Sequence, residues 1–150
     1  MNNGSGVSLW LIVLLVIVVW PLFVFLLWSA ILWLMSKFGG WDRLAKLYAA
    51  PSSPVDGKRL SSVSGMIGLA RYNRILTVTP TSEGFHLEVR RVFRYRHPPL
   101  FIPWPDVHNA RKASFLNWGY VAFEIGAPPV ARMKLQEIAF DGAPVTISPR

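Results

Sequence analysis

The sequence contains no cysteine, so it can form neither a disulfide framework nor a thiolate metal site. Charged residues are scarce at 16% of the chain, whereas a soluble domain typically carries about 25%. No charged side chain precedes Lys37, so the whole net charge of +8 belongs to the part that begins there. This distribution indicates that the N-terminal part contacts lipid.

Recognisable catalytic motifs are also missing. His86, His97 and His108 lack metal-ligand spacing, and the eight acidic residues form no close pair suited to acid–base chemistry. The sequence has no glycine-rich phosphate loop and no nucleophile elbow. We therefore expect a protein that is not an enzyme and that uses no cofactor or metal.

Long apolar runs, in contrast, are present. Between Val7 and Met35 only Ser8 and Ser29 interrupt the apolar residues. One helical span needs about 20 residues, and two spans with a turn need more than about 40. The run therefore predicts a single transmembrane helix, with its bounds at 7–36, after an N-terminal tail at 1–6.

The apolar run has two alternative interpretations. A re-entrant segment turning at Pro21 is the alternative to a kinked span, because proline removes one helical hydrogen bond. A cleavable signal peptide is excluded: the tail has no basic side chain, the run is too long, and no small-x-small site follows it.

The orientation follows from the flanking basic residues. None precedes the span, whereas Lys37, Arg43 and Lys46 follow it closely. The positive-inside rule then places the N-terminus outside and the C-terminal domain in the cytoplasm.

Tryptophans are unusually frequent in and after the span. Trp20 and Trp28 lie deep in the run, and their rings either pack against lipid or contact another membrane protein. Together with Trp41 and Trp104 they are the candidate interface residues.

Residues 37–57 predict a membrane-proximal helix and a linker. Gly39-Gly40 should end the span, and an amphipathic helix over 41–50 should follow, with a proline- and serine-rich linker at 51–57. The apolar stripe of the helix consists of Trp41, Leu44, Leu47 and Tyr48. The stripe faces either the inner leaflet or the helix's own β domain.

Residues 58–150 predict a basic, mainly-β domain. A β-branched run at 75–79 and a turn at 80–84 lead into the clearest alternation of the chain. One face of this alternation holds Phe85, Leu87, Val89, Phe93 and Tyr95; the other holds His86, Glu88, Arg90, Arg94 and Arg96. We expect the first face to be buried and the second to face solvent or ligand, with a bulge or strand end near Arg91.

The rest of the domain predicts short strands. The proline-rich segment 97–107 suits only a sheet edge, with Leu100, Ile102 and Trp104 entering the core. Further strands are expected at 118–125, 130–135 and 145–148, and a helical turn at 136–140. The spacing favours a bent antiparallel sheet or an open barrel.

A family resemblance rests on residues 65–135. Glu83-Gly84 precedes a strand, and a His-Pro-Pro-Leu run leads into the segment that ends at Asp106-Val107. This pattern resembles small single-pass bacterial membrane proteins of unknown function with a PH-like (pleckstrin-homology-like) β domain. The resemblance implies a bacterial inner-membrane location and a PH-like sheet, and no ligand residue follows from it.

Arginines are concentrated in one part of the predicted β domain. Arg90, Arg94 and Arg96, with Arg71 and Arg74 on the adjacent strand, form a candidate site for anionic lipid, and a solvated strand face is the alternative. Two functions are therefore open. The first is an accessory or assembly subunit whose domain binds a protein partner at the membrane. The second is a module that binds anionic headgroups. A nucleic-acid partner is not expected, because no nucleic-acid-binding module is recognisable.

Overall fold

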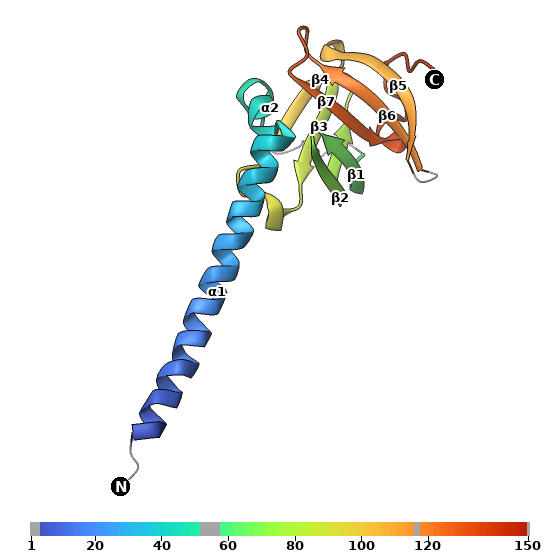
Figure 1. The fold of residues 1–150 in the computed structure, drawn as a ribbon. Helices are drawn as coiled ribbons and strands as arrows, with labels where there is room; N and C mark the ends of the chain where they lie inside the picture. The colour runs from blue at the N-terminus through green and yellow to red at the C-terminus, as the bar shows by residue number, and fades with distance from the viewer. Residues whose placement is uncertain (1–3, 52–57, 116–117, 150) are drawn as a thin grey trace.

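The computed structural model describes residues 4–51, 58–115 and 118–149. A long helix, α1, leads into a β domain at its C-terminal end (Figure 1). In chain order the elements are α1 (Gly4–Gly39), α2 (Trp41–Tyr48), β1 (Leu60–Ile67), β2 (Ala70–Pro80), β3 (Gly84–Val89), η1 (Arg91–Phe93), β4 (Leu100–Pro103), η2 (Trp104–Asp106), β5 (Val107–Phe115), β6 (Trp118–Ile125), β7 (Ala131–Gln136) and η3 (Glu137–Phe140).

Helix α1 is continuous through Pro21, so the chain does not turn back there. Its 36 residues correspond to a length of about 54 Å, and it is long and apolar enough to span a membrane. Side chains from Leu9 to Leu27 are exposed along this helix, whereas Leu32, Ser36 and Gly39 are buried against the β domain. The helix therefore has a free part, from Leu9 to Leu27, and a part packed on the β domain that includes Leu32, Ser36 and Gly39.

Gly39 and Gly40 form the corner between α1 and α2, as the sequence predicted. Gly40 adopts a φ of 75°, a left-handed conformation that favours glycine. Gly39 lies so close to the β1–β2 hairpin that an added Cβ would come within 2.7 Å of the Ala70 Cβ. The corner thus lets α1 end directly against the sheet.

The seven strands form one antiparallel sheet in the order β4-β3-β2-β1-β7-β6-β5. The sheet curls into a half-barrel, as the sequence predicted in its bent-sheet or open-barrel alternative. Its two edge strands, β4 and β5, follow each other in the chain and are joined by η2. The barrel is therefore open between them.

Both edge strands carry additional backbone pairing. On the β4 side, Ala49 bridges Leu100, and the N–H of Ala50 donates to the carbonyl of Pro99 at 3.0 Å. On the β5 side, Ser148 forms a parallel bridge with Arg111. These contacts cover backbone groups that would otherwise offer a template for aggregation.

The core fills the concave side of the sheet and includes α2. Trp41 and Leu44 are fully buried, so this helix packs on its own β domain and not on a leaflet. The predicted stripe was wrong at Leu47, which is 65% exposed. Helix η3 contributes Phe140 to the core beside Phe85.

Several local predictions are confirmed. Strand β6 covers residues 118–125, β4 lies at the sheet edge, and Leu100, Ile102 and Trp104 are buried. Helix η3 is the predicted helical turn. Strand β5 was missed, because the sequence pattern did not predict it. The strand predicted at 145–148 is wrong, since these residues form only a single bridge.

Phe85 provides a test of the core. Its ring lies 5.3 Å from the ring of Trp104 and 6.2 Å from that of Phe123, measured between centroids. Phe85→Ala should lower the free energy of unfolding by about 3–5 kcal/mol, because it leaves a cavity. Denaturant unfolding of the full chain in nanodiscs measures this. Leu69→Ala, at an 82% exposed position, is the control and should change it by less than about 0.5 kcal/mol.

Candidate membrane-facing site

The arginine-rich segment 90–96 is not a strand. Strand β3 ends at Val89, and the N–H of Arg90 still donates to the carbonyl of Ile75 before the chain turns into η1. Arg96 then adopts a φ of 58°. The strand therefore ends at Val89, and the predicted strand end near Arg91 is confirmed.

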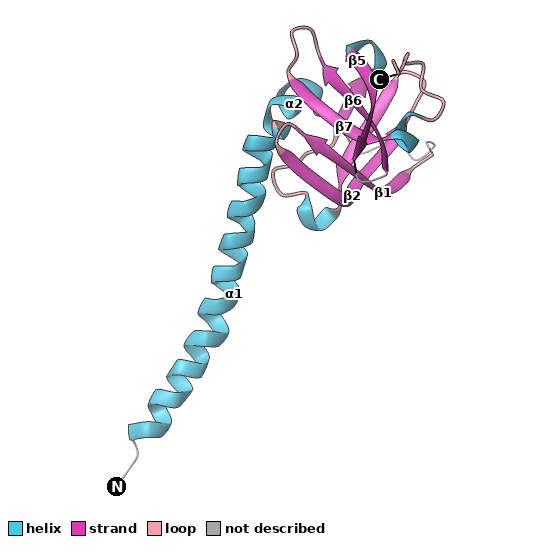
Figure 2. Cartoon of the chain, turned by 45° about the vertical axis from the view of Figure 1, so that its right-hand side comes forward, coloured by secondary structure: helices cyan, strands magenta, loops and turns pink. Residues whose placement is uncertain are grey.

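This segment lies against α1. The Phe93 ring is 5.3 Å from the Trp28 ring, and the Ser36 hydroxyl donates to the carbonyl of Arg96 at 3.1 Å. In both views η1 lies at the end of the β domain nearest the free part of α1 (Figures 1 and 2). Phe93 is half-buried: it contacts Trp28 and packs against the margin of the core, so the predicted core position is confirmed only in part.

The outer side of the segment mixes charge with apolar surface. Arg91 and Arg96 are exposed, as are Val92 at 72% and Tyr95 at 57%. Within the described part of the chain, neither Arg91 nor Arg96 makes an ion pair. Arginine beside an exposed tyrosine and an aliphatic side chain suits a lipid headgroup layer, where charge and apolar atoms are both accommodated.

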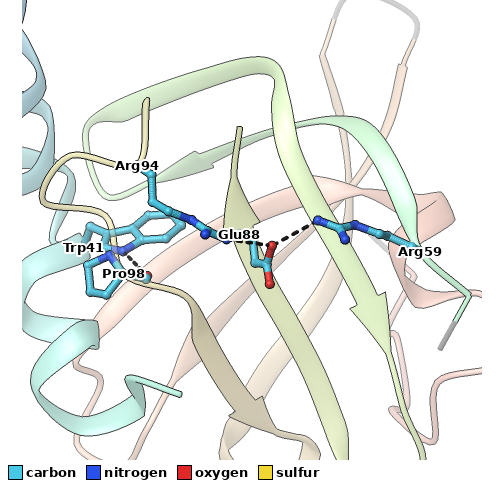
Figure 3. Close-up of polar contacts among 5 residues, drawn as sticks. All are labelled: Trp41, Arg59, Glu88, Arg94 and Pro98. Atoms are coloured by element: carbon cyan, nitrogen blue, oxygen red, sulfur yellow. Dashed lines mark hydrogen bonds and ion pairs between the residues drawn. The ribbon is translucent and has the colours of Figure 1, made fainter. Parts of the chain in front are cut away.

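Arg94 has a different role. Its guanidinium lies 3.2 Å from the Glu88 carboxylate, and Arg59 approaches the same oxygen from the other side at 3.1 Å (Figure 3). Glu88 is only 3% exposed, so the prediction that Glu88 and Arg94 face solvent or ligand was wrong for Glu88. A buried carboxylate needs such partners, and Arg94 is therefore a structural residue.

A cluster of polar contacts connects residues 95–98 with the α1–α2 corner. The indole N–H of Trp41 donates to the carbonyl of Pro98 at 3.0 Å (Figure 3). His97 Nδ1 lies 3.0 Å from the carbonyl of Tyr95, and His97 Nε2 lies 3.1 Å from the Tyr72 hydroxyl. Because a carbonyl only accepts, Nδ1 carries the proton and Nε2 accepts from Tyr72.

His97 is buried and neutral in this arrangement. Burial lowers its pKa, while the hydrogen bond to the Tyr95 carbonyl acts in the opposite direction and more weakly. Burial also raises the pKa of Tyr72 far above its usual value, so Tyr72 remains a donor. The cluster is thus built for uncharged side chains.

The remaining candidate arginines lie elsewhere. Arg71 and Arg74 line a groove with Arg59 beside β1, and the Arg71 side chain donates to Asn73. Arg90 reaches the margin of this groove, where it donates to the Ser62 hydroxyl at 3.2 Å. The structure therefore separates the predicted cluster into a groove group and a segment beside α1.

The candidate interface tryptophans also separate into two groups. Trp41 and Trp104 are buried, and the Trp104 indole donates to the carbonyl of Thr81, so these two are core residues. Trp20 is 65% exposed on the free part of α1, and Trp28 lies where the free part ends. Of these four tryptophans, Trp20 and Trp28 are the two exposed on α1.

Sequence reasoning missed the basic residues of the convex sheet face. Arg111, Arg132 and Lys134 line a second groove across β5, β6 and β7. Residues 132 and 134 alternate with buried Met133 and Leu135, a signal that was present in the sequence. Their position beside Arg111 could not be predicted, because strand β5, which carries Arg111, was not expected.

Among the described residues no group of three or more His, Asp or Glu side chains is placed to hold a metal ion. Comparisons with protein families, curated proteins and solved structures gave no match to this chain.

The polar cluster predicts acid sensitivity. Unfolded histidine binds a proton near pH 6.5, whereas buried His97 does not, so the free energy of unfolding should fall as the pH drops below about 6.5. The fall should end where folded His97 itself becomes protonated. Unfolding of the full chain in nanodiscs at pH 7 and pH 5 measures this loss.

His97→Gln should make that loss smaller, by about 1.4 kcal/mol for each unit by which the pKa is lowered. His86 also has its pKa lowered by burial, so His86→Gln should reduce the loss independently. Leu69→Ala, which removes no titratable group, is the control and should leave the loss of unfolding free energy unchanged. An equal loss in the wild type and His97→Gln would contradict the assignment.

Proposed function

We propose that this chain is a single-pass membrane protein whose non-catalytic β domain is seated on anionic lipid headgroups by residues 91–96. The observation that carries the proposal is the position of this segment: it is fixed beside Trp28, where the free part of α1 ends. Arg91 and Arg96 then lie at the level at which headgroup phosphates begin.

The length of the free part of α1 supports this. From Leu9 to Leu27 the helix extends about 28 Å, close to the hydrocarbon thickness of about 30 Å. Exposed apolar side chains surround it, a surface far larger than soluble monomers tolerate. Trp10 and Trp28 then fall at the two interfaces, where indole rings are favoured.

The expected strength follows from the two unpaired arginines. Each basic residue near an anionic leaflet contributes about 1 kcal/mol, so Arg91 and Arg96 together contribute about 2 kcal/mol, or roughly thirtyfold in lipid preference. Arg94 adds less, because Glu88 already neutralises it.

The orientation and location belong to the same proposal. Lys37, Arg43 and Lys46 favour a cytoplasmic position for the β domain, and the sequence resemblance favours a bacterial inner membrane. The likeness to PH-like domains is supported by the curled antiparallel sheet. In the described residues, however, the helix packed on that sheet is α2, which precedes it.

A second candidate is the accessory or assembly subunit that binds a protein partner. The groove across β5, β6 and β7 favours it, because this surface is basic and lies away from the segment beside α1. The two functions are compatible, since they use different surfaces.

The orientation can be tested with single cysteines, because the chain has none of its own. Ser5→Cys should react with an impermeant maleimide on intact cells, whereas Ala127→Cys, in the β6–β7 turn, should react only after lysis. Labelling of Ala127→Cys from outside would reverse the proposed orientation.

The headgroup contact can be tested by the lipid that co-purifies with the full chain in mild detergent. Replacing Arg91 and Arg96 by Gln should lower the ratio of phosphatidylglycerol to phosphatidylethanolamine severalfold, since both charges are lost. The matched control replaces Arg111 and Lys134 by Gln and should keep the wild-type ratio. Equal losses in the two double variants would show a dependence on net charge alone and contradict the proposal.

A further inference from the structure

A row of side chains crosses the convex face of the sheet. The strand register aligns Arg111 of β5 with Ala122 of β6, Lys134 of β7, Met66 of β1 and Arg71 of β2. Their neighbours along the strands, such as Leu135 and Phe123, point into the core. Three cations are therefore placed along one line, separated by an alanine and a methionine.

This face is hollowed along the row. A groove of about 1220 Å³ lies over β5, β6 and β7, and another of about 850 Å³ lies beside β1 and β2. A small hollow lined by Arg71, Tyr120 and Lys134 shares residues with both. These three hollows share lining residues and are here together called the sheet groove, with Arg59 and Arg74 at one end and Ser148 at the other.

Only some of the charges in the sheet groove are neutralised internally. Lys112 pairs with Glu137 at 2.7 Å, and Arg132 pairs with Glu124 at 3.0 Å. Within the described residues Arg111 and Lys134 make no ion pair, and both are exposed. The sheet groove therefore carries more positive than negative charge, although Glu124 and Glu137 also line it.

We propose that the sheet groove binds an extended acidic segment of a partner protein. This inference rests on the accessory role proposed above and not on the headgroup contact. Five strands at a spacing of about 4.8 Å extend the row over about 19 Å, which an extended chain of about six residues would cover. Glu or Asp side chains of that segment then pair with Arg71, Lys134 and Arg111.

The floor of the sheet groove favours a polypeptide over a nucleic acid. Ala122 lies between Arg111 and Lys134, and Ala113 lines the same part of the sheet groove; both are small residues that allow a backbone to approach closely. Trp118 lines one end of the sheet groove and Tyr120 extends from that end to the small hollow, so in the described surface these two aromatic side chains do not form a row of stacking platforms for bases.

The part of the sheet groove over β5, β6 and β7 also lies away from the proposed lipid contact, whereas its other end lies beside β1 and β2. Strands β5, β6 and β7 lie at the end of the β domain farther from the free part of α1 in both views (Figures 1 and 2). The C-terminal residues 148–149 form part of its wall, held by the pairing of Ser148 with β5. A partner segment seated there would be presented to the aqueous side.

The test uses the full chain in phosphatidylcholine nanodiscs and a fluorescein-labelled peptide of about eight residues with alternating Glu and Thr. Fluorescence anisotropy should show binding, and a Gln-Thr peptide should bind far more weakly. Charge reversal by Arg111→Glu with Lys134→Glu should weaken binding by at least about tenfold. Ala122→Leu fills the floor without changing charge and should also weaken it severalfold.

The matched control is Arg91→Glu with Arg96→Glu, which changes the net charge equally and should leave peptide affinity within about twofold. Equal weakening by both reversals would overturn the inference, and so would unchanged binding in Ala122→Leu. Tighter binding of a thymidine oligonucleotide through Arg111 and Lys134 would assign the sheet groove to nucleic acid instead. A partner that still co-purifies with the Arg111→Glu, Lys134→Glu variant would preserve the accessory role while overturning this site.

Discussion

The contact between the α1–α2 corner and residues 96–98 determines how the rest of the molecule is arranged. Ser36, Trp41 and Tyr72 each make one hydrogen bond to this short stretch, at Arg96, Pro98 and His97. The bonds are buried or half-buried, where their loss leaves polar groups unsatisfied. The bonds from Ser36 and Trp41 fix the β domain to the end of the helix, and with the Phe93–Trp28 contact they give the exposed arginines a defined depth relative to the free part of α1.

The arginines of this chain serve distinct purposes that depend on burial. Arg59 and Arg94 neutralise the buried carboxylate of Glu88. Their removal would leave that carboxylate as an unpaired buried charge and would destabilise the fold. Arg91 and Arg96 remain available to an external anion. A charge-removal experiment that includes Arg94 would therefore mix a loss of stability with a loss of binding, whereas Arg91 and Arg96 separate the two.

The curl of the sheet connects the core and the proposed partner surface. Its concave side encloses the apolar residues and α2, and its convex side is left with polar residues and small gaps between them. Because a strand alternates its side chains between the two faces, burial of Met133 and Leu135 obliges Arg132 and Lys134 to lie outside. The same register that builds the core thus aligns the cations across it.

The sequence by itself determined the features that arise from neighbouring residues. The apolar run before Lys37, the Gly39-Gly40 corner and strand β6 all depend on local hydropathy, glycine conformation or period-two alternation. Tertiary structure alone decided that Glu88 is buried, that α2 joins the core, and that Arg71 lies in line with Lys134 and Arg111. Each of these depends on which distant segments pair and in what register. The free energy of such pairing cannot be inferred from any short stretch of the chain.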